Sequence, residues 1–191
     1  MDCRLRRMVR AVFVTTNEHK RREAQTILGV ELETASPDVP EIQALDVAKV
    51  ALHKARAACD ALGASPHPII VEDSGLVIQA WNGLPGALTK WFVSSVGVEG
   101  ILDMISSADR SARAVCAVAV ADKSGEVRVF TGEVEGVVAP EPRGSSGFGW
   151  DPIFVPAGSD LTYAEMGDAK NRDSHRARAF RAARSWFEGP E

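Results

Sequence analysis

The stretch IIVEDSG, Ile69 to Gly75, decides the fold that we predict for this chain. Three β-favouring apolar residues run directly into two carboxylates, a hydroxyl and a glycine, a pattern typical of a buried strand that delivers acidic groups to a cleft. Gly75 permits a sharp backbone turn or the close approach of a ligand. An acidic turn after a strand explains these seven residues at least as well on their own, so the interpretation depends on what the rest of the chain supplies.

The length and charge of the chain limit the class of protein. With 191 residues and 45% hydrophobic composition, the chain is long enough for one globular domain with a substantial core. We assign this domain to residues 11–191 and expect the basic segment 1–10 to be a flexible extension. The net charge of -4 provides no general attraction to nucleic acid or to an anionic membrane, so we expect neither as a partner. Any phosphate chemistry must then come from a local basic pocket.

Cysteine usage and hydropathy indicate the cellular compartment. Cys3, Cys59 and Cys116 are odd in number and lack metal-ligand spacing, which suits a reducing cytoplasm better than a disulfide framework. The apolar run after the basic N-terminus, Ala11 to Val14, is far shorter than a signal peptide or a membrane span. We therefore expect a soluble, cytoplasmic protein.

The first part of the chain predicts a site for an anion. Ala11 to Val14 reads as a short buried strand, and Thr15-Thr16-Asn17 as a loop that caps a helix beginning near Glu18. Free backbone N–H groups and the positive end of the helix dipole would face a phosphate there, and Lys20 adds a full charge. A simple helix cap with a solvated lysine is the alternative, because the loop lacks the glycines and spacing of a P-loop.

Periodicity places the remaining elements. A helix is predicted from Leu45 to Leu62, ending at Gly63, and periodicity does not choose between its Lys49 and Lys54 as a cleft residue. The other expected elements are strands at Val30 to Thr34 and Leu76 to Ala80, helices at Lys90-Trp91-Phe92 and Val98 to Ile105, and an antiparallel hairpin of Ala114 to Ala121 with Val127 to Val134.

A glycine-rich stretch from Gly144 to Phe154 carries two aromatic candidates for binding a base. Phe148 and Trp150 offer faces on which a planar base stacks, worth about 1–3 kcal/mol per base, and Asp151 adds an acceptor beside them. From this segment alone, a glycine loop that leads into an edge strand at Ile153 to Val155 is an equally good interpretation.

The C-terminal segment places two polar residues at the start of a helix. Asp173 or Ser174 is the expected cap, so His175 and Arg176 lie at a helix N-terminus, where anions and carbonyl acceptors bind favourably. An arginine-rich solvated face accounts well for Arg178, Arg181 and Arg184. It accounts less well for Arg176, which shares the face of Phe180.

Five stretches in order closely resemble the inosine/xanthosine triphosphate pyrophosphatase family. They are Thr15-Thr16-Asn17-Glu18-His19-Lys20, Val71 to Gly75, Gly83-Leu84-Pro85-Gly86, Phe148-Gly149-Trp150-Asp151-Pro152 and Ser174-His175-Arg176. The resemblance implies an elongated, two-lobed α/β fold in which helices flank a long, twisted mixed β-sheet around a central nucleotide cleft, usually as a homodimer. It also implies Mg²⁺-dependent hydrolysis, with Mn²⁺ as an alternative metal, of ITP, dITP and XTP to the monophosphate and pyrophosphate, which cleanses the nucleotide pool.

The resemblance also assigns roles to individual residues. Those expected to hold the triphosphate are Thr15, Thr16, Asn17, Lys20 and Lys54. The expected metal carboxylates are Glu41, Glu72 and Asp73, with Asp73 also the catalytic base that activates water. Ser74 and Lys90 would line the cleft. The residues expected to hold the base and ribose are Phe148, Gly149, Trp150 and Asp151, with Lys170, His175 and Arg176 closing over the purine.

The chain departs from the family at two positions. Thr16 stands where the family generally has glycine, so the loop must keep φ negative there or carry strain. Leu88 stands where tyrosine is frequent. Two other functions stay open: a Maf-like pyrophosphatase for other modified nucleotides, and a nucleotide-binding protein without turnover.

Overall fold

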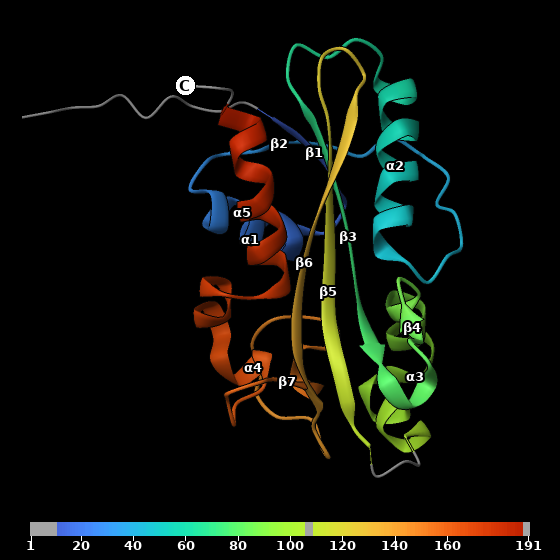
Figure 1. Ribbon diagram of the computed structural model, residues 1–191, viewed down its shortest axis with the longest axis vertical. Helices are drawn as coiled ribbons and strands as arrows, with labels where there is room; N and C mark the ends of the chain where they lie inside the picture. Colours follow the sequence, from blue (N-terminus) through green and yellow to red (C-terminus); the bar gives the residue numbers. More distant parts are fainter. Residues whose placement is uncertain (1–10, 106–108, 189–191) are drawn as a thin grey trace, which may run out of the picture.

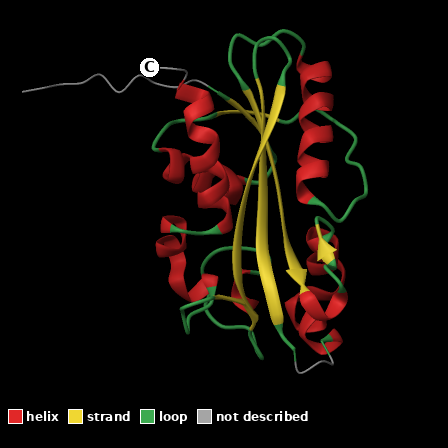
Figure 2. Ribbon diagram, viewed as in Figure 1, coloured by secondary structure: helices red, strands yellow, loops and turns green. Residues whose placement is uncertain are grey.

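A computed structural model describes residues 11–105 and 109–188 of the chain. The expected extension at residues 1–10 lies outside these described ranges. A seven-stranded mixed sheet runs along the long axis, with helices on both sides of it (Figures 1 and 2). The strands are β1 (Val12–Val14), β2 (Glu33–Ala35), β3 (Ile69–Ile78), β4 (Pro85–Gly86), β5 (Ser111–Ala121), β6 (Val127–Val138) and β7 (Phe154–Pro156). The helices are α1 (Glu18–Leu28), α2 (Val47–Leu62), α3 (Thr89–Met104), α4 (Tyr163–Met166) and α5 (His175–Glu188), with short 3-10 turns at Gln79–Trp81, Asp151–Ile153 and Gly167–Arg172.

The pairing of the sheet changes from parallel to antiparallel at β3. Its strand order is β2-β1-β3-β5-β6-β7, and β4 pairs with β3 outside this path. β1 pairs in parallel with β2 and β3, whereas β3, β5, β6 and β7 pair antiparallel in turn. The predicted hairpin is confirmed and forms the longest pair, with strands that extend beyond the predicted ends. The sheet is therefore mixed, as expected, and β3 is the strand on which its two halves meet.

β3 passes straight through the acidic stretch, so the chain makes no sharp turn at Gly75, one of the two roles that the sequence allowed for this glycine. The ten residues of β3 pair continuously with β5, from Ile69 opposite Ala121 to Ile78 opposite Ala112. The glycine is needed for another reason. A Cβ at Gly75 would overlap the carbonyl oxygen of Gly86, because β4 pairs with β3 next to this point. Close approach of backbone, and not of a ligand, explains this glycine.

Three apolar clusters divide the molecule into an upper and a lower part. In the orientation of Figure 1, α1 and α5 pack on one face of the upper sheet around Phe13, Ile70 and Phe180. The helix α2 covers the opposite face over Val71. In the lower part, Leu76 and residues of α3, α4 and β7 form a third cluster. The long strands β3, β5 and β6 run through both parts, which gives the elongated two-lobed architecture that the sequence predicted.

Most of the predicted elements are present, with shifted ends. The helix after Asn17 and the helix that ends at Gly63 form as expected. The strand expected at Val30 to Thr34 begins later, at Glu33. The two helices expected around Trp91 and after Val98 join as α3, broken by the non-helical backbone of Gly97.

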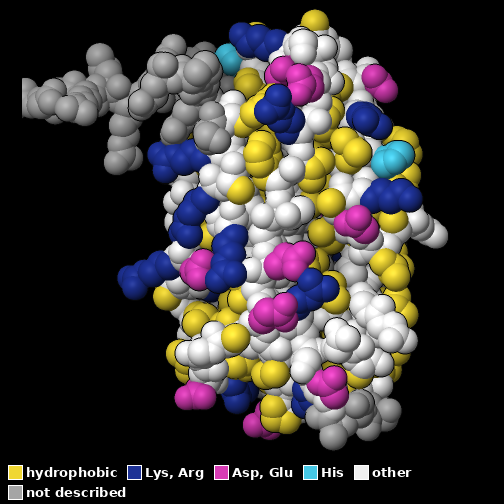
Figure 3. Space-filling view, viewed as in Figure 1, with side chains coloured by type: hydrophobic (Ala, Val, Ile, Leu, Met, Phe, Trp, Pro, Cys, Tyr) yellow, Lys and Arg dark blue, Asp and Glu magenta, His cyan; other side chains and the backbone are white. Residues whose placement is uncertain are grey.

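The face of the molecule shown in Figure 3 carries charges of both signs. On the face shown in Figure 3, basic and acidic side chains are interspersed and do not gather into a patch of one sign. Within the described ranges, no helix is both long and apolar enough to cross a membrane.

Candidate functional site

A cavity of about 700 Å³ opens between the two lobes beside β3. This volume lies in the range of small-molecule sites. Its walls come from the β1–α1 loop, the segment 41–44 and α2 above, from β3 in the middle, and from α3 and the loop 148–150 below. Thirteen predicted site residues line it: Thr15, Thr16, Asn17, Lys20, Glu41, Lys54, Glu72, Asp73, Ser74, Lys90, Phe148, Gly149 and Trp150.

The loop between β1 and α1 forms one end of the cavity. The Asn17 side chain caps α1 by accepting from the amides of His19 (3.0 Å) and Lys20 (3.2 Å), and Thr15 Oγ1 accepts from the Asn17 amide (3.1 Å). These bonds fix the loop and occupy the amides of His19 and Lys20. An anion bound here would therefore interact with the helix dipole and the Lys20 charge, and not with these two amides. Thr16 is exposed in the cavity and keeps a negative φ, since Asn82 is the only described residue besides glycine with a positive φ. The Cβ at Thr16 therefore causes no left-handed strain.

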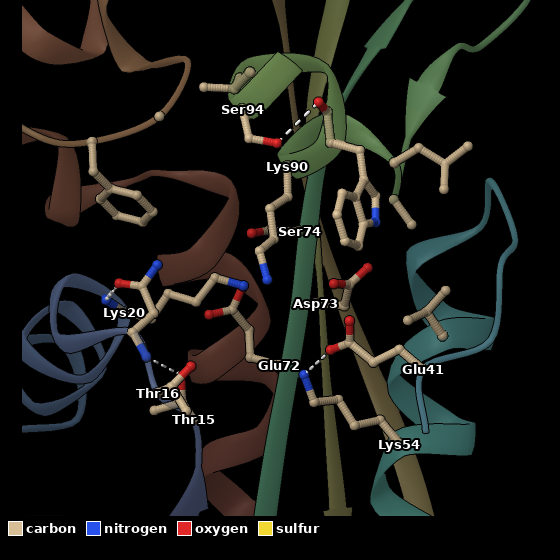
Figure 4. A pocket seen from close by; sticks show the side chains of 18 of the residues that line it. Thr15, Thr16, Lys20, Glu41, Lys54, Glu72, Asp73, Ser74, Lys90 and Ser94 are labelled. Carbon is tan, nitrogen blue, oxygen red and sulfur yellow. Dashed lines mark hydrogen bonds and ion pairs between the residues drawn. The ribbon is translucent and has the colours of Figure 1, made fainter. Parts of the chain in front are cut away.

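The neighbouring carboxylates Glu72 and Asp73 lie on opposite faces of β3. Successive side chains of a strand alternate between faces, and β3 has no turn to change that. Figure 4 shows Glu72 on the side of Lys20 and Asp73 on the side of Glu41 and Lys54. In the part of the chain that the structure describes, no group of three or more His, Cys, Asp or Glu side chains could hold a metal ion together. The carboxylates predicted as one metal set are thus divided by the strand.

Glu72 is a buried anion that two cations, Arg176 and Lys20, and the Ser74 hydroxyl already contact. Arg176 donates to both of its oxygens (3.1 and 3.2 Å), and Lys20 Nζ lies 3.3 Å from Oε1. Burial disfavours the charge, but Arg176 and Lys20 outweigh burial and hold the pKa of Glu72 far below its usual range. Glu72 is therefore ionised at every relevant pH, and its main contact is with protein cations.

Asp73 is in the opposite situation, because it has few partners. Its Oδ2 atom is buried without a hydrogen-bond partner among the described residues. Burial raises the pKa of Asp73 to about 6, with Lys20 opposing and the charge of Glu72 adding to this effect. A carboxylate with a pKa near neutrality and a vacant oxygen can accept a proton or bind a cation.

Glu41 and Lys54 complete the side of the cavity that Asp73 faces. Lys54 Nζ donates to Glu41 Oε1, and Figure 4 shows this pair directly beside Asp73. Burial opposes the charge of Glu41, but the hydrogen bond and charge of Lys54 outweigh it and lower its pKa. The vacant Asp73 oxygen and the Glu41 carboxylate fit Mg²⁺, which takes one or two protein carboxylates plus waters and phosphate oxygens. Lys49, the other lysine that periodicity allowed, is not part of the cavity wall.

Four predicted site residues lie behind the cavity wall, and three of them, Asp151, Lys170 and Arg176, form a buried ionic network with Glu23 and Glu72. Arg176 donates to Glu23 Oε2 (2.5 Å) and to Ser74 Oγ (3.1 Å) in addition to Glu72. Lys170 Nζ lies 2.8 Å from Glu23 Oε1 and 2.5 Å from Asp151 Oδ2. Asp151 Oδ2 also accepts from the Phe148 amide at 2.9 Å. The network therefore connects β3 with the loop that carries the aromatic residues.

His175, the fourth residue of this set, is fully buried among aromatic rings. Its ring lies 5.2 Å from that of Trp150 and is stacked 5.8 Å from that of Tyr163. Burial and the nearby Arg176 charge lower its pKa well below the usual value, so the ring is neutral at pH 7. Neither ring nitrogen has a partner among the described residues. Ser174, rather than Asp173, accepts from the Ala177 amide (3.1 Å) in the first turn of α5.

Sequence reasoning missed three residues. Glu23 is buried between Arg176 and Lys170, and its signal was an acidic residue beside Ala24 on the buried face of α1. Trp91 lines the cavity although 60% of it is exposed, with Lys90 Nζ 5.7 Å from its ring. His19 stacks on Phe148 across the cavity (5.2 Å), a contact between segments that no local pattern indicates.

The raised pKa of Asp73 predicts a pH-dependent gain in stability for Asp73→Asn. The pKa is about 6 in the folded chain against 3.8 for the ordinary group, so the favourable contribution of Asp73 exists below pH 4 and is lost as the pH rises through 6. In metal-free buffer, Asp73→Asn should raise the free energy of unfolding at pH 8 by roughly 1–3 kcal/mol. Near pH 4 the gain should vanish.

Urea unfolding at the two pH values measures this difference. Asp103→Asn, which changes an exposed carboxylate, is the matched control and should show no such pH dependence. Equal stability of Asp73→Asn and the unaltered chain at pH 8 would show that Asp73 is not desolvated.

Comparisons with known proteins agree over nearly the full chain. Residues 11–186 match the Ham1 family. A dITP/XTP pyrophosphatase of Methanopyrus kandleri is 40% identical over 184 residues, covering 94% of this chain and 96% of that protein. An inosine triphosphate pyrophosphatase of Aspergillus fumigatus is 42% identical over 185 residues, covering 94% and 95%. The Ham1 protein of Staphylococcus aureus superposes with a TM-score of 0.80 at 28% identity, over 95% of this chain and all 100% of that one.

Proposed function

The chain belongs to the Ham1 family, and from that premise we propose that it is a pyrophosphatase for non-standard purine nucleoside triphosphates. Its substrates are ITP, dITP and XTP, which it hydrolyses to the monophosphate and pyrophosphate. This activity removes deaminated purines from the nucleotide pool. The proposal extends to this chain the activities for which its relatives from Methanopyrus kandleri and Aspergillus fumigatus are named.

One observation carries the proposal: a single cavity combines two lysines, two aromatic rings and the buried carboxylate of Asp73. Lys20 and Lys54 supply charge for a triphosphate, while Phe148 and Trp150 supply faces for a base. We infer that a nucleoside triphosphate binds with its phosphates toward the lysines and its base toward the rings, with its α-phosphate near the partly desolvated carboxylate of Asp73.

The chemistry of the chain's own residues follows from this placement. We assign Asp73 to accept the proton of the attacking water, because its pKa of about 6 leaves it ionised at pH 7 but basic enough to take a proton. Lys20 and Lys54 neutralise charge that develops on the departing pyrophosphate. Asp73 and Glu41 hold the metal in this proposal, and Glu72 fixes the position of Lys20. When bound, Mg²⁺ supplies Lewis-acid polarisation of the phosphate oxygens, a role that Mn²⁺ can also fill.

Recognition of the purine is assigned to the lower lobe. The N–H of the neutral His175 ring, which has no partner among the described residues, and the Lys170 ammonium lie behind Phe148 and Trp150. A 6-oxo purine would accept hydrogen bonds from such donors, whereas the 6-amino group of adenine would leave them unpaired, at about 1–3 kcal/mol for each buried group.

The first experiment is identification of the products from ITP. We expect the monophosphate and pyrophosphate in one step, because the carboxylates serve the α-phosphate and leave the β–γ bond unattacked. A chelator should abolish turnover and Mg²⁺ should restore it. ATP and a modified pyrimidine triphosphate are the control substrates and should be much poorer.

Other outcomes would identify the alternatives. Diphosphate and orthophosphate as primary products would place the reactive phosphate elsewhere. Faster hydrolysis of the modified pyrimidine nucleotide would favour a Maf-like pyrophosphatase. Tight binding of ITP without any product would favour a nucleotide-binding protein.

Assembly and location complete the proposal. We propose that residues 11–191 act as one domain, which the single sheet and the family match over residues 11–186 support. We also propose a homodimer, supported by the exposed apolar residues Trp91, Val96 and Met104 of α3. A cytoplasmic location fits the nucleotide substrates and the free thiols of Cys59 and Cys116. Sedimentation analysis would measure the oligomeric state.

A further inference from the structure

We propose that His19 is a positioning residue for the base: its imidazole holds the Phe148 ring in the orientation that stacks on the purine. The inference rests on the proposed function, since it names a residue that serves base recognition from within the phosphate-binding loop. The segment Thr15 to Lys20 would therefore contribute to both ends of the substrate.

The contact joins two segments that meet only across the cavity. His19 lies in the first turn of α1, where its amide is fixed by Asn17 and its side chain is exposed toward the cavity. The imidazole and the Phe148 ring are stacked, with centroids 5.2 Å apart and planes 24° from parallel. This is the geometry of an attractive aromatic pair. It is also a direct link between α1 in the upper lobe and the loop 148–150 in the lower lobe.

The orientation of the Phe148 ring depends on such contacts, because the glycines beside it allow its loop many backbone conformations. Gly147 and Gly149 flank it with φ values of 76° and 62°, a conformation that constrains the chain little beyond what its hydrogen bonds impose. The Phe148 amide donates to Asp151 Oδ2 (2.9 Å), and the Asp151 amide donates to the Phe148 carbonyl oxygen (3.2 Å). The ring itself is fixed by what surrounds it: the His19 ring, and the Lys170 and Arg176 cations at 5.4 Å from its centroid.

The two cations and His19 have different freedom to move. Lys170 and Arg176 are almost fully buried and held by Glu23, Glu72 and Asp151. The His19 side chain is exposed, and the stack on Phe148 is the contact that orients it among the described residues. Because Lys170 and Arg176 are held by buried carboxylates, His19 is the partner that contacts Phe148 from the cavity wall, and it sets how the Phe148 ring is presented to a purine.

The test separates binding of the base from binding of the polyphosphate by using two ligands, one with the base and a single phosphate and one with three phosphates and no base. Calorimetric titration with inosine monophosphate measures binding of the base, and titration with inorganic tripolyphosphate measures binding of the phosphates. For His19→Ala we expect the Kd for inosine monophosphate to rise about three- to tenfold, the range of an aromatic pair, while the Kd for tripolyphosphate stays the same. Neither titration requires turnover, so the result is independent of whether the unaltered chain hydrolyses ITP.

Two further variants make the result specific to the stack. His19→Phe keeps an aromatic ring without a charge or hydrogen bond and should restore the Kd for inosine monophosphate. The matched control Arg22→Ala changes an exposed residue of the same helix outside the cavity wall and should leave both Kd values unchanged. In kinetics with ITP, His19→Ala should raise KM by the same factor and change kcat by less than about twofold.

A double-mutant cycle with Phe148→Leu measures whether the two rings act together. We expect the effects of His19→Ala and Phe148→Leu on inosine monophosphate binding to be strongly non-additive. In the Phe148→Leu background there is no ring for His19 to hold, so removal of His19 should have little further effect. Additive effects, a failure of His19→Phe to restore binding, or an equal loss of tripolyphosphate binding in His19→Ala would each overturn the proposal and assign His19 to the phosphates or to no role.

Discussion

Asp73→Asn should lower kcat for ITP by about 10²–10⁴-fold, the contribution of general base catalysis, with a further loss from the missing metal ligand. The substitution keeps the size and shape of the side chain but removes the negative charge. It leaves the rest of the cavity unchanged, because Asp73 Oδ2 has no hydrogen-bond partner among the described residues to lose. Initial rates of pyrophosphate release at saturating Mg²⁺ measure the effect.

The pH dependence of the unaltered chain supports the same assignment. With the pKa of Asp73 at about 6, kcat/KM should rise with pH through this value, because the protonated carboxyl can neither accept a proton nor hold a cation. The folded state of Asp73→Asn, checked by circular dichroism and by its expected higher stability at pH 8, excludes misfolding as the cause. Near-normal turnover in this folded variant would move the catalytic centre away from Asp73.

Arg176→Ala should destabilise the fold by roughly 3–5 kcal/mol, the usual effect of removing one partner of a buried ion pair. Arg176 is 2% exposed, and its guanidinium donates to Glu23, Glu72 and Ser74. Alanine would leave two buried carboxylates without their main counter-charge and would open a cavity beside them. Urea unfolding monitored by tryptophan fluorescence measures the loss.

A control variant and a comparison of two substrates test whether the role of Arg176 is structural. Arg128→Ala, which removes an exposed arginine paired only with Glu126 at the surface, should change the free energy of unfolding by less than about 1 kcal/mol. The resemblance to the family implied that Arg176 closes over the purine, where it could donate to the 6-oxo group. If Arg176→Ala keeps its stability and loses activity on ITP far more than on ATP, the direct contact with the base is supported and the structural role is not.

Local patterns in the sequence predicted the parts of the site that lie next to one another in the chain. The β1–α1 loop formed as predicted, since Asn17 caps the helix with bonds that span only two or three residues. The Lys54 helix and the hairpin of β5 and β6 also formed as predicted, because their hydrophobic periods are local properties. Neither role that the sequence allowed for Gly75 explains this glycine, because it accommodates the backbone of the paired strand β4, and no local pattern describes such a neighbour.

By itself, the sequence determined the family, the class of fold and the segments that carry the chemistry, because residue type and order are enough for these. Only the tertiary structure decided which charges meet. Glu72 and Asp73 are adjacent in sequence yet separated by the alternation of one unbroken strand, whereas Arg176 reaches Glu23 across 153 positions and Glu72 across 104. Desolvation and pairing depend on these distances in space. As a result, Glu72 is ionised and paired with Arg176 and Lys20. Asp73 instead keeps an oxygen without a hydrogen-bond partner among the described residues, which is available for a proton or a metal ion.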